Sequence, residues 1–366
     1  MFFKKTNQPD YFLISAIFVL MIAGFVILAS ASSEIGKIKF NDSYYFLKHQ
    51  ITFGFSLGLL GFLVAYFIPY KSYRSASFAF LLFSIILLAL VFTNLGITSG
   101  GASRWLKIGP IVFQPAELVK LTFILYLAAW LSNLKMNRSR DFWTGFMPFI
   151  LISGFIAALL LLQPATSTVM ILMGTGMIMY FISGARLSHL AIVVLAGLMV
   201  LSVIILFTPY RLQRITTFFN PGNDMSGAAY QINQSLNAIG SGGLFGVGYG
   251  RSTSKSSYLP DPIDDSIFAV AAEELGFIGI SMLIIFFAFL VFRLFWLAKN
   301  LRDRFGQLVL VGFGSLIAFQ SIVNMGAISG LLPLTGVPLP FISYGGTALA
   351  VFMTLGGISV NISKYA

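Results

Sequence analysis

Long apolar segments follow one another along almost the whole chain, and they limit the folds it can adopt. A bilayer-spanning helix needs about 20 mostly apolar residues, and in hydrocarbon the backbone must satisfy its own hydrogen bonds. The segments lie at roughly 11–32, 50–69, 76–95, 113–132, 146–163, 167–183, 189–208, 266–296, 307–329 and 344–362. The sequence therefore predicts an all-α integral membrane protein with ten transmembrane helices, forming a single polytopic domain over 1–366.

The composition agrees with this class. Charged residues make up 10% of the chain and hydrophobic residues 57%, whereas a soluble domain carries about 25% charged residues. The net charge of +11 would suggest nucleic-acid binding in a soluble protein. In a membrane protein the excess of Lys and Arg in cytoplasmic loops explains much of it, so we expect no nucleic-acid partner.

The first apolar segment has some features of a secretory signal peptide. Lys4 and Lys5 precede it, and "ASAS" at 29–32 looks like a cleavage site. Its apolar core of about 20 residues exceeds the 7–15 residues of a signal peptide, and nine further segments follow. We interpret it as a retained span.

The basic residues predict the orientation of the chain. With a cytoplasmic N-terminus, ten spans also place the C-terminus inside. One set of short loops then carries Lys4, Lys5, Lys71, Arg74, Lys135, Arg138, Arg140, Arg186, Lys299, Arg302, Arg304 and Lys364. The opposite side carries Lys37, Lys39, Lys48, Arg104, Lys107, Arg211, Arg214, Arg251 and Lys255. The positive-inside rule does not explain the second set, so its members are candidates for binding an anion.

Metal and disulfide chemistry find little support in the sequence. The chain has no cysteine and only two histidines, His49 and His189, which this topology places on opposite sides of the membrane. We therefore expect no disulfide, no thiolate metal site and no histidine-based metal cluster.

One connection, 209–265, is much longer than the others and lies on the outer side, between the seventh and eighth spans. Its "YQINQSLNAIG" at 230–240 has near-helical spacing and predicts a short re-entrant or interfacial helix. The following "SGGLFGVGYG" at 241–250 is either a flexible linker or a functional loop. Two more loops rich in Gly and Pro, at 98–120 and 330–349, fall on the same side.

Glu117 and Lys120 lie three residues apart inside the fourth predicted span. A charged group at the bilayer centre costs about 2.5–3.5 kcal/mol, and residues three apart share a helix face. We expect the two to pair, either as a structural ion pair or as part of a substrate cavity.

Five of the twelve acidic residues fall within "LPDPIDDSIFAVAAEELG" at 259–276. Asp264 or Asp265 is placed to cap the helix that follows. Glu273 and Glu274 lie about 12–14 Å further along that helix, so they are too distant to form a carboxylate dyad with Asp265. We interpret them as a structural pair.

A carboxylate at the outer surface, close to basic loops, suits one chemistry in particular. It can accept a proton from a sugar hydroxyl, while the basic residues stabilise a departing pyrophosphate. An apolar groove between helices can hold a lipid tail. This points to sugar transfer from a lipid-pyrophosphate donor, as one option among several.

Five motifs occur in order along the chain. They are "RWLKIGPIVFQPAELVKL" (104–121), "RITTFFNP" (214–221), "YQINQSLNAIGSGGLFGVGYG" (230–250), "LPDPIDDSIFAVAAEELGFIG" (259–279) and "NMGAISGLLPLTGVPLPFISYGGT" (324–347). Together they resemble the SEDS family (shape, elongation, division and sporulation) of membrane peptidoglycan glycosyltransferases. "YYFLKHQ" (44–50) and "YRLQRITTFFNP" (210–221) are more similar to the division branch, FtsW, than to RodA.

This resemblance implies ten spans, cytoplasmic termini and polymerisation of lipid II with release of undecaprenyl pyrophosphate. It implies that Asp265 is the essential acid, acting as general base, with a class B penicillin-binding protein as transpeptidase partner. It also implies other division proteins as partners, and the septal region of the bacterial cytoplasmic (inner) membrane as the location. A divalent cation, Mg²⁺ or Mn²⁺, is compatible with the reaction, but the sequence shows no dedicated cage for one. The candidate substrate-binding residues are Arg104, Lys107, Glu117, Lys120, Arg214, Gln231, Arg251, Lys255, Ser343 and Tyr344.

Two positions depart from the family pattern. Ala165, in "QPATST", stands where an Asp is common, and Asp264 stands where a Thr is common. A second carboxylate beside Asp265 is expected to raise the pKa of its neighbour.

Three alternatives remain open at the level of sequence. A lipid II flippase would use Glu117 and Lys120 along a transport path. A RodA-like polymerase would serve elongation instead of division. A scaffold for other division proteins would leave Asp265 and the Gly-Pro loops unexplained.

Overall fold

The structure is a computed structural model that describes residues 8–99, 102–109, 111–133, 140–219, 227–257 and 259–366. Lys4, Lys5, Lys135 and Arg138, which contributed to the predicted orientation, lie outside these residues.

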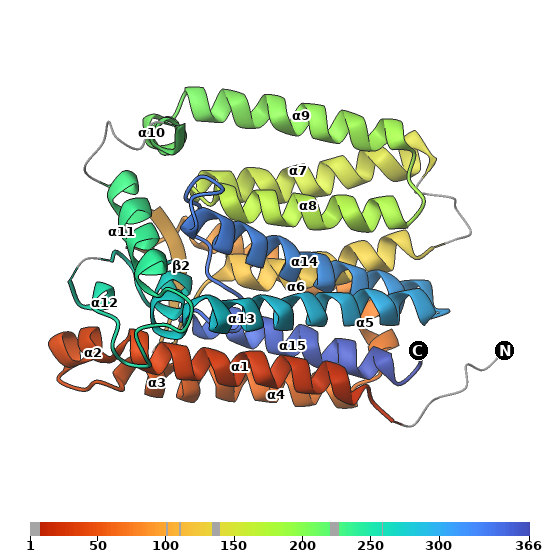
Figure 1. The fold of residues 1–366 in the computed structure, drawn as a ribbon. Coiled ribbons are helices and arrows are strands. Elements are labelled where there is room, and N and C mark those ends of the chain that lie inside the picture. Colours follow the sequence, from red (N-terminus) through yellow and green to blue (C-terminus); the bar gives the residue numbers. More distant parts are fainter. Residues whose placement is uncertain (1–7, 100–101, 110, 134–139, 220–226, 258) are drawn as a thin grey trace.

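The chain forms a helical bundle in which α1 begins and α15 ends at the same end (Figure 1). The helices before the long connection are α1 (Tyr11–Ala31), α2 (Ser33–Phe40), α3 (Tyr45–His49), the π-helix η1 (Gln50–Phe55), α4 (Ser56–Phe67), α5 (Tyr70–Leu90), α6 (Pro115–Leu131), the π-helix η4 (Phe142–Phe146), α7 (Met147–Leu162), α8 (Thr166–Ile182) and α9 (Leu187–Leu206). Those that follow are α10 (Pro209–Phe219), α11 (Ala228–Ser241), α12 (Ser254–Ser257), α13 (Ile267–Asn300), α14 (Arg304–Ile328) and α15 (Gly346–Ser363).

Each of the ten predicted spans corresponds to a helix or to a continuous helical run. Eight of these, within the described residues, are long and apolar enough to cross a membrane. The other two are α6 and α8, each of 17 residues. The mostly helical membrane fold is thus confirmed, while the count of ten spans stays a prediction.

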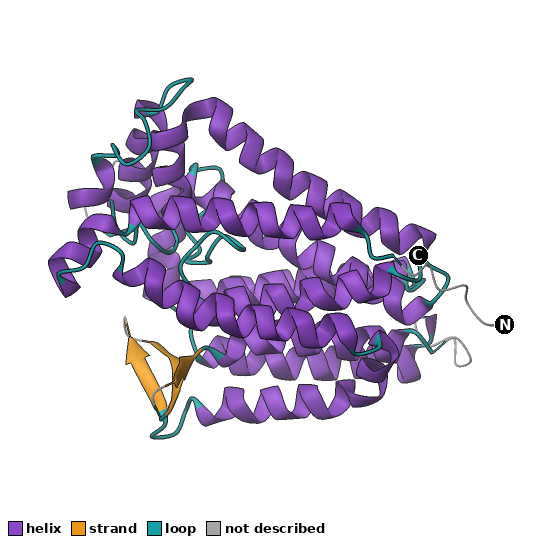
Figure 2. Ribbon diagram, turned by 90° about the horizontal axis from the view of Figure 1, so that it is seen from below, coloured by secondary structure: helices purple, strands orange, loops and turns teal. Residues whose placement is uncertain are grey.

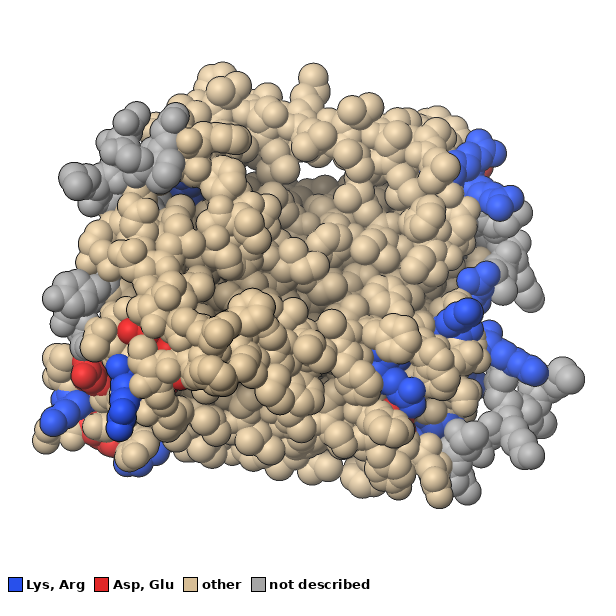
Figure 3. Space-filling model, in the orientation of Figure 1, with Lys and Arg blue, Asp and Glu red and all other residues tan. Residues whose placement is uncertain are grey.

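The centre of the bundle is formed by α14 and α15, each with 72% of its apolar window buried. By contrast, α9 has only 6% of its window buried. The space-filling view is open between α9 and the helices below it (Figure 3). The bundle therefore has a tightly packed core and one helix that contacts it sparsely.

The prediction of an all-α fold is wrong at 96–113, where a small sheet forms. Strands β1 (Gly96–Ser99), β2 (Ala102–Ile108) and β3 (Ile111–Phe113) pair antiparallel in that order. Leu106 is fully buried and packs against α5, while Gly109, with φ +62°, lies in the tight β2–β3 turn. The sheet lies at the end of the bundle opposite the C-terminus (Figure 2).

Charged side chains gather at the two ends of the bundle (Figure 3). Lys and Arg dominate the end where the C-terminus lies, whereas both signs of charge occur at the opposite end. A broad band between them shows neither. This distribution fits a protein whose middle lies in hydrocarbon.

Helix α13 is interrupted at Gly276, whose φ of 67° and ψ of −171° are not helical. The Gly-rich segment at 241–250 docks on this break. The amides of Val247 and Gly248 donate to Glu273 O and Glu274 O (2.9 and 3.2 Å), and Phe277 N donates to Gly243 O (2.9 Å). The flexible-linker interpretation of this segment is therefore wrong, and the predicted 230–240 helix is confirmed within α11.

We predict that Gly276→Ala destabilises the protein. This backbone conformation costs a non-glycine residue about 1–3 kcal/mol, and a Cβ here would lie 2.2 Å from Gly246 N. The measurement is thermal unfolding of the detergent-purified protein. Gly240→Ala is the matched control, because its Cβ would meet nothing within 4 Å; equal stability of the two variants would refute the expectation.

Candidate functional site

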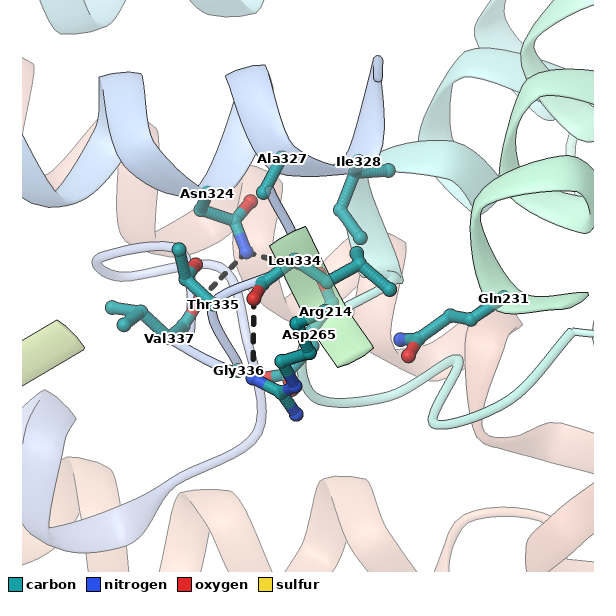
Figure 4. A pocket seen from close by; sticks show the side chains of 10 residues that line it. All are labelled: Arg214, Gln231, Asp265, Asn324, Ala327, Ile328, Leu334, Thr335, Gly336 and Val337. Atoms are coloured by element: carbon teal, nitrogen blue, oxygen red, sulfur yellow. Dashed lines mark hydrogen bonds between the residues drawn. The ribbon is translucent and has the colours of Figure 1, made fainter. Parts of the chain in front are cut away.

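A small pocket lies where α13 begins, and Asp265 lines it (Figure 4). Four parts of the chain meet there: α10, α11, the start of α13, and α14 with the α14–α15 connection (residues 329–345). The lining residues are Arg214, Gln231, Asp265, Asn324, Ala327, Ile328, Leu334, Thr335, Gly336 and Val337. Arg214, Gly336 and Asp265 lie next to one another in the close view (Figure 4).

The start of α13 does not use either aspartate as a helix cap. Ser266 occupies the N-cap position, and no side chain there makes a capping hydrogen bond. The turn before it is closed by Asp264 N and Ser266 N, which both donate to Asp261 O (3.2 and 3.1 Å). The capping interpretation is therefore wrong, and the Asp265 carboxyl group is available for another role.

Side chains from other elements hold the backbone around Asp265. Asn324 Nδ2 donates to Asp265 O (3.0 Å), and Ser343 Oγ donates to Asp264 O (2.7 Å). Gln231 Nε2 donates to Ser266 Oγ (3.0 Å). The position of Asp265 is thus set from α14, α11 and the α14–α15 connection.

Both aspartates have raised pKa values. Burial, then repulsion from Asp261, raises the pKa of Asp265 to about 6, although the charges of Arg214 and Arg104 act in the opposite direction. Burial, then repulsion from Asp265 and Asp261, raises the pKa of Asp264 to about 7. Repulsion between the two aspartates thus contributes to the raised pKa of Asp264, whereas the acidic neighbour that raises the pKa of Asp265 is Asp261 and not, as expected, Asp264.

Of the predicted anion-binding residues, Arg214 and Arg104 act on Asp265 electrostatically. Arg214 reaches the pocket from α10, and its Nη1 donates to Leu334 O (3.1 Å). Arg104 on β2 donates to Gln163 O (3.1 Å) and Pro164 O (2.6 Å). These two carbonyls precede Ala165, so Arg104 is held by the main chain beside the position where an Asp is common in the family.

Lys107 and Arg251 are exposed and do not line the pocket. Lys107 lies on β2, paired with Val112 of β3. Arg251 follows the Gly-rich segment that docks on α13. Their proposed contact with pyrophosphate stays a prediction.

The prediction that Lys255 contacts pyrophosphate disagrees with this arrangement. The side chain is buried, and its ammonium donates to Glu274 Oε1 (2.8 Å), Ser30 Oγ (2.8 Å) and Gly250 O (3.1 Å). An ammonium has three N–H donors, so none is left for a ligand. Glu274 is thereby paired, which agrees with its interpretation as a structural residue.

Glu273 also has a structural environment. Its carboxylate accepts from Ser252 Oγ (2.6 Å) and from Thr253 N (3.1 Å). It is buried, and it ties the segment after the Gly-rich stretch to α13. The interpretation of Glu273 and Glu274 as a structural pair is confirmed.

The predicted pairing of Glu117 with Lys120 is confirmed. Lys120 Nζ lies 2.6 Å from Glu117 Oε1 and 2.9 Å from Gln320 Oε1, and all three side chains are buried. Neither charged residue lines the Asp265 pocket. Their predicted role in binding substrate stays a prediction.

Ser343 and Tyr344 do not line the pocket but bind the backbone just before Asp265. Tyr344 N donates to Ile263 O (2.9 Å), and its hydroxyl is bonded to His49 Nδ1 (2.8 Å). Gln50 Oε1 accepts from Gly345 N (3.1 Å). The "YYFLKHQ" motif thus holds the segment that holds Asp264, a role for His49 and Gln50 that the sequence analysis did not identify.

Asn324 and Gly336 are two further site residues that the sequence did not predict. Both lie in the motif at 324–347, but nothing in the local pattern distinguishes them from their neighbours. Gly336 has φ +66°, and a Cβ there would lie 3.3 Å from Asp265 Oδ2. Its backbone therefore packs directly against the carboxylate.

We predict that Glu117 and Lys120 are energetically coupled. Removing one partner of a buried ion pair costs about 3–5 kcal/mol, because the other charge is left unpaired. Glu117→Gln and Lys120→Met should each lower thermal stability, and the double variant should lose less than the sum. The exposed pair Lys48–Asp42 is the control and should show little coupling; strict additivity at Glu117 and Lys120 would show that they are independent.

Comparison with known proteins places the chain in a family. Residues 11–366 match the model of a family of cell cycle proteins named after FtsW, RodA and SpoVE. Stage V sporulation protein E of Bacillus subtilis is 37% identical over 366 residues, covering 99% of each chain. A probable peptidoglycan glycosyltransferase FtsW of Trichlorobacter lovleyi is 37% identical over 360 residues, covering 98% of this chain and 94% of its own.

Solved structures with the same fold are also known. A chain from a study of how a peptidoglycan synthase complex coordinates polymerization and crosslinking matches with a TM-score of 0.81 and 27% identity, covering 97% of this chain and 98% of its own. RodA of Thermus thermophilus matches with a TM-score of 0.71 and 28% identity, covering 97% of each chain. The family match and relatives of this identity extend along nearly the whole length, so the chain belongs to the SEDS family of FtsW, RodA and SpoVE.

Proposed function

We propose that the chain is a peptidoglycan glycosyltransferase that polymerises lipid II, with Asp265 as the general base. Relatives along the full length carry the name peptidoglycan glycosyltransferase FtsW. The observation that supports the assignment of the base is the partly buried carboxyl group of Asp265. It lies in a pocket at the end of a membrane bundle. The charges of Arg214 and Arg104 there lower the pKa of Asp265, against the effect of burial.

The reaction that suits this site is a single displacement. The 4-hydroxyl oxygen of the acceptor GlcNAc attacks the anomeric carbon of the donor MurNAc, and its proton passes to the Asp265 carboxylate. The bond from the anomeric carbon to the pyrophosphate oxygen breaks, and the electron pair leaves with undecaprenyl pyrophosphate. One displacement inverts the α-linked donor to a β-linked product.

Charge and apolar surface near Asp265 fit the other parts of such a substrate. Arg214 and Arg104 can stabilise the negative charge of the leaving pyrophosphate. An apolar pocket of about 260 Å³ lies along the first part of α13, where Phe268, Ala272 and Phe277 line it in part. It is suited to part of a polyprenyl chain, as is the open space beside α9.

The flippase alternative loses the feature that suggested it. Glu117 and Lys120 are buried against protein and against each other, so they do not line a wet path. A pure scaffold would not need a carboxyl group with a raised pKa in a pocket. The relatives named FtsW favour a role in septal synthesis over RodA-like elongation.

The proposal includes a partner and a location. A solved neighbour belongs to a peptidoglycan synthase complex, which supports a class B penicillin-binding protein as transpeptidase partner beside other division proteins. We place the chain in the bacterial cytoplasmic membrane, at the septum, with both termini cytoplasmic. Among the described residues no group of three or more His, Asp or Glu side chains is arranged to hold a metal, and assistance by Mg²⁺ or Mn²⁺ stays a prediction.

We predict that Asp265→Asn abolishes most polymerisation. The amide keeps the size of the carboxyl group but cannot accept the proton, so the rate should fall by a factor of about 100–10,000. The measurement is glycan-chain formation from lipid II with the partner present, beside thermal stability and lipid II binding, which should persist. Asp264→Asn is the matched control and should be much milder. Near-normal polymerisation by Asp265→Asn would remove the assignment, and a dead Asp264→Asn with a live Asp265→Asn would move the base by one residue.

We also predict a pH dependence of polymerisation. A base must be ionised to accept a proton, and the pKa of Asp265 is raised to about 6. The rate should therefore fall as the pH is lowered through about 6, and level off above it. The measurement is the initial rate between about pH 5 and 8, at pH values where the protein remains folded. A rate that does not change across this range would contradict Asp265 as the base.

A further inference from the structure

The part of the α14–α15 connection that faces Asp265 has no regular secondary structure, yet its carbonyl groups are paired. Four carbonyls around Gly336 accept a hydrogen bond from a side chain of another element. The donors and acceptors are Arg214 to Leu334 O (3.1 Å), Ser167 to Thr335 O (2.7 Å), Asn324 to Val337 O (2.7 Å) and Gln320 to Pro338 O (2.8 Å). We call these four side chains, from α10, α8 and α14, the clamp.

The residue at the centre of the clamp contacts the catalytic carboxyl group. Gly336 lies between the two clamped pairs of carbonyls, and a Cβ on it would lie 3.3 Å from Asp265 Oδ2. The clamp therefore sets how closely the backbone approaches that oxygen (Figure 4). A shift of the connection would alter the space beside Asp265 directly.

Asn324 joins the clamp to Asp265 itself. Its Nδ2 donates both to Val337 O and to Asp265 O (2.7 and 3.0 Å). Both neighbours are carbonyl oxygens, so the amide nitrogen and not the amide oxygen must face them. One side chain thus fixes the relative position of the two segments that form the pocket.

The orientation of Gln320 is set by the buried ion pair. Lys120 has only donors, so the atom of Gln320 that faces it is Oε1 (2.9 Å). Gln320 Nε2 is thereby directed at Pro338 O. Lys120 and Glu117 do not line the Asp265 pocket. Their ion pair instead orients Gln320 and so supports the clamp.

The network that supports the clamp leaves two of its polar atoms unpaired. Within the described residues, Glu117 Oε2 and Asn324 Oδ1 are buried and have no hydrogen-bond partner. An unpaired buried polar atom costs about 1–3 kcal/mol. Ser321 on the same helix also has an unpaired buried hydroxyl, so the case for the clamp rests on its contacts with Gly336 and the Asp265 segment.

We infer that Asn324 and Gln320, oriented by Lys120 and Glu117, are positioning residues that hold Gly336 at a set distance from the Asp265 carboxyl group. This inference rests on the proposed function. The variants that test it are Asn324→Ala and Gln320→Leu. Ser321→Ala is the matched control, since Ser321 is buried on the same helix and has no hydrogen-bond partner among the described residues.

The experiment measures kcat, KM and the pH profile of polymerisation from lipid II for each variant, beside thermal stability. A misplacement of about 1 Å at a reacting group can lower a rate by about 100-fold. We expect kcat to fall by about 10- to 100-fold in Asn324→Ala, with a smaller change in KM. Looser packing should expose Asp265 to water. The acidic limb of the pH–rate profile should then move to lower pH, toward the ordinary pKa of an aspartate. Ser321→Ala should match the wild type.

Several outcomes decide the matter. If kcat falls only with the folded fraction and the acidic limb stays in place, the side chains are structural and the inference is wrong. If Asn324→Ala does not fold, Gln320→Leu and the milder Ser167→Ala carry the same expectation for kcat and pH profile. If the wild type polymerises, Asp265→Asn does not, and the folded clamp variants are normal, the inference alone fails. If the wild type forms no glycan, the proposed function fails with it.

Discussion

A carbonyl group buried inside a membrane protein must find a hydrogen-bond donor, and much of the arrangement around Asp265 follows from this requirement. The α14–α15 connection has little regular structure of its own, so donors come from polar side chains such as Asn324 and Gln320. The break in α13 at Gly276 creates the same need, and there the Gly-rich segment supplies main-chain groups. Asn324 and Gln320, which are polar residues within an otherwise apolar helix, are therefore explained by the irregular backbone that they face.

The electrostatics of the pocket balance opposing effects. Burial and Asp261 favour the neutral form of Asp265, whereas Arg214 and Arg104 favour its charged form. The resulting pKa of about 6 lets the group lose its proton near neutral pH and still accept one during a reaction. Without the two arginines the pKa of Asp265 would be higher, and without burial it would be lower.

The sequence predicted the features that depend on local pattern. Apolar stretches predicted the helices, and the spacing of Glu117 and Lys120 predicted their ion pair. It did not predict features whose partners are distant in the chain. Lys255 looked available for an anion, because nothing nearby reveals that Ser30, 225 residues earlier, would take one of its donors. Gln320 lies 200 residues from Lys120, and Asn324 resembles any other polar residue in a helix. The sheet at 96–113 was missed because glycines in a loop and glycines in a hairpin look alike without the pairing.

The buried junction of Lys255, Glu274 and Ser30 has a consequence for the way the protein is made. During translation α1 enters the bilayer long before the residues that will cover its Ser30 side exist. The polar group that α1 brings to this junction is the small hydroxyl of Ser30. The free-energy cost of exposing it to lipid before its partners are made is therefore low. The two charges arrive later and only 19 residues apart, so they can be buried together as a neutral unit. Helix α1 can therefore complete its packing only after the ribosome has delivered α13, so assembly must join two segments that lie 244 residues apart in the chain.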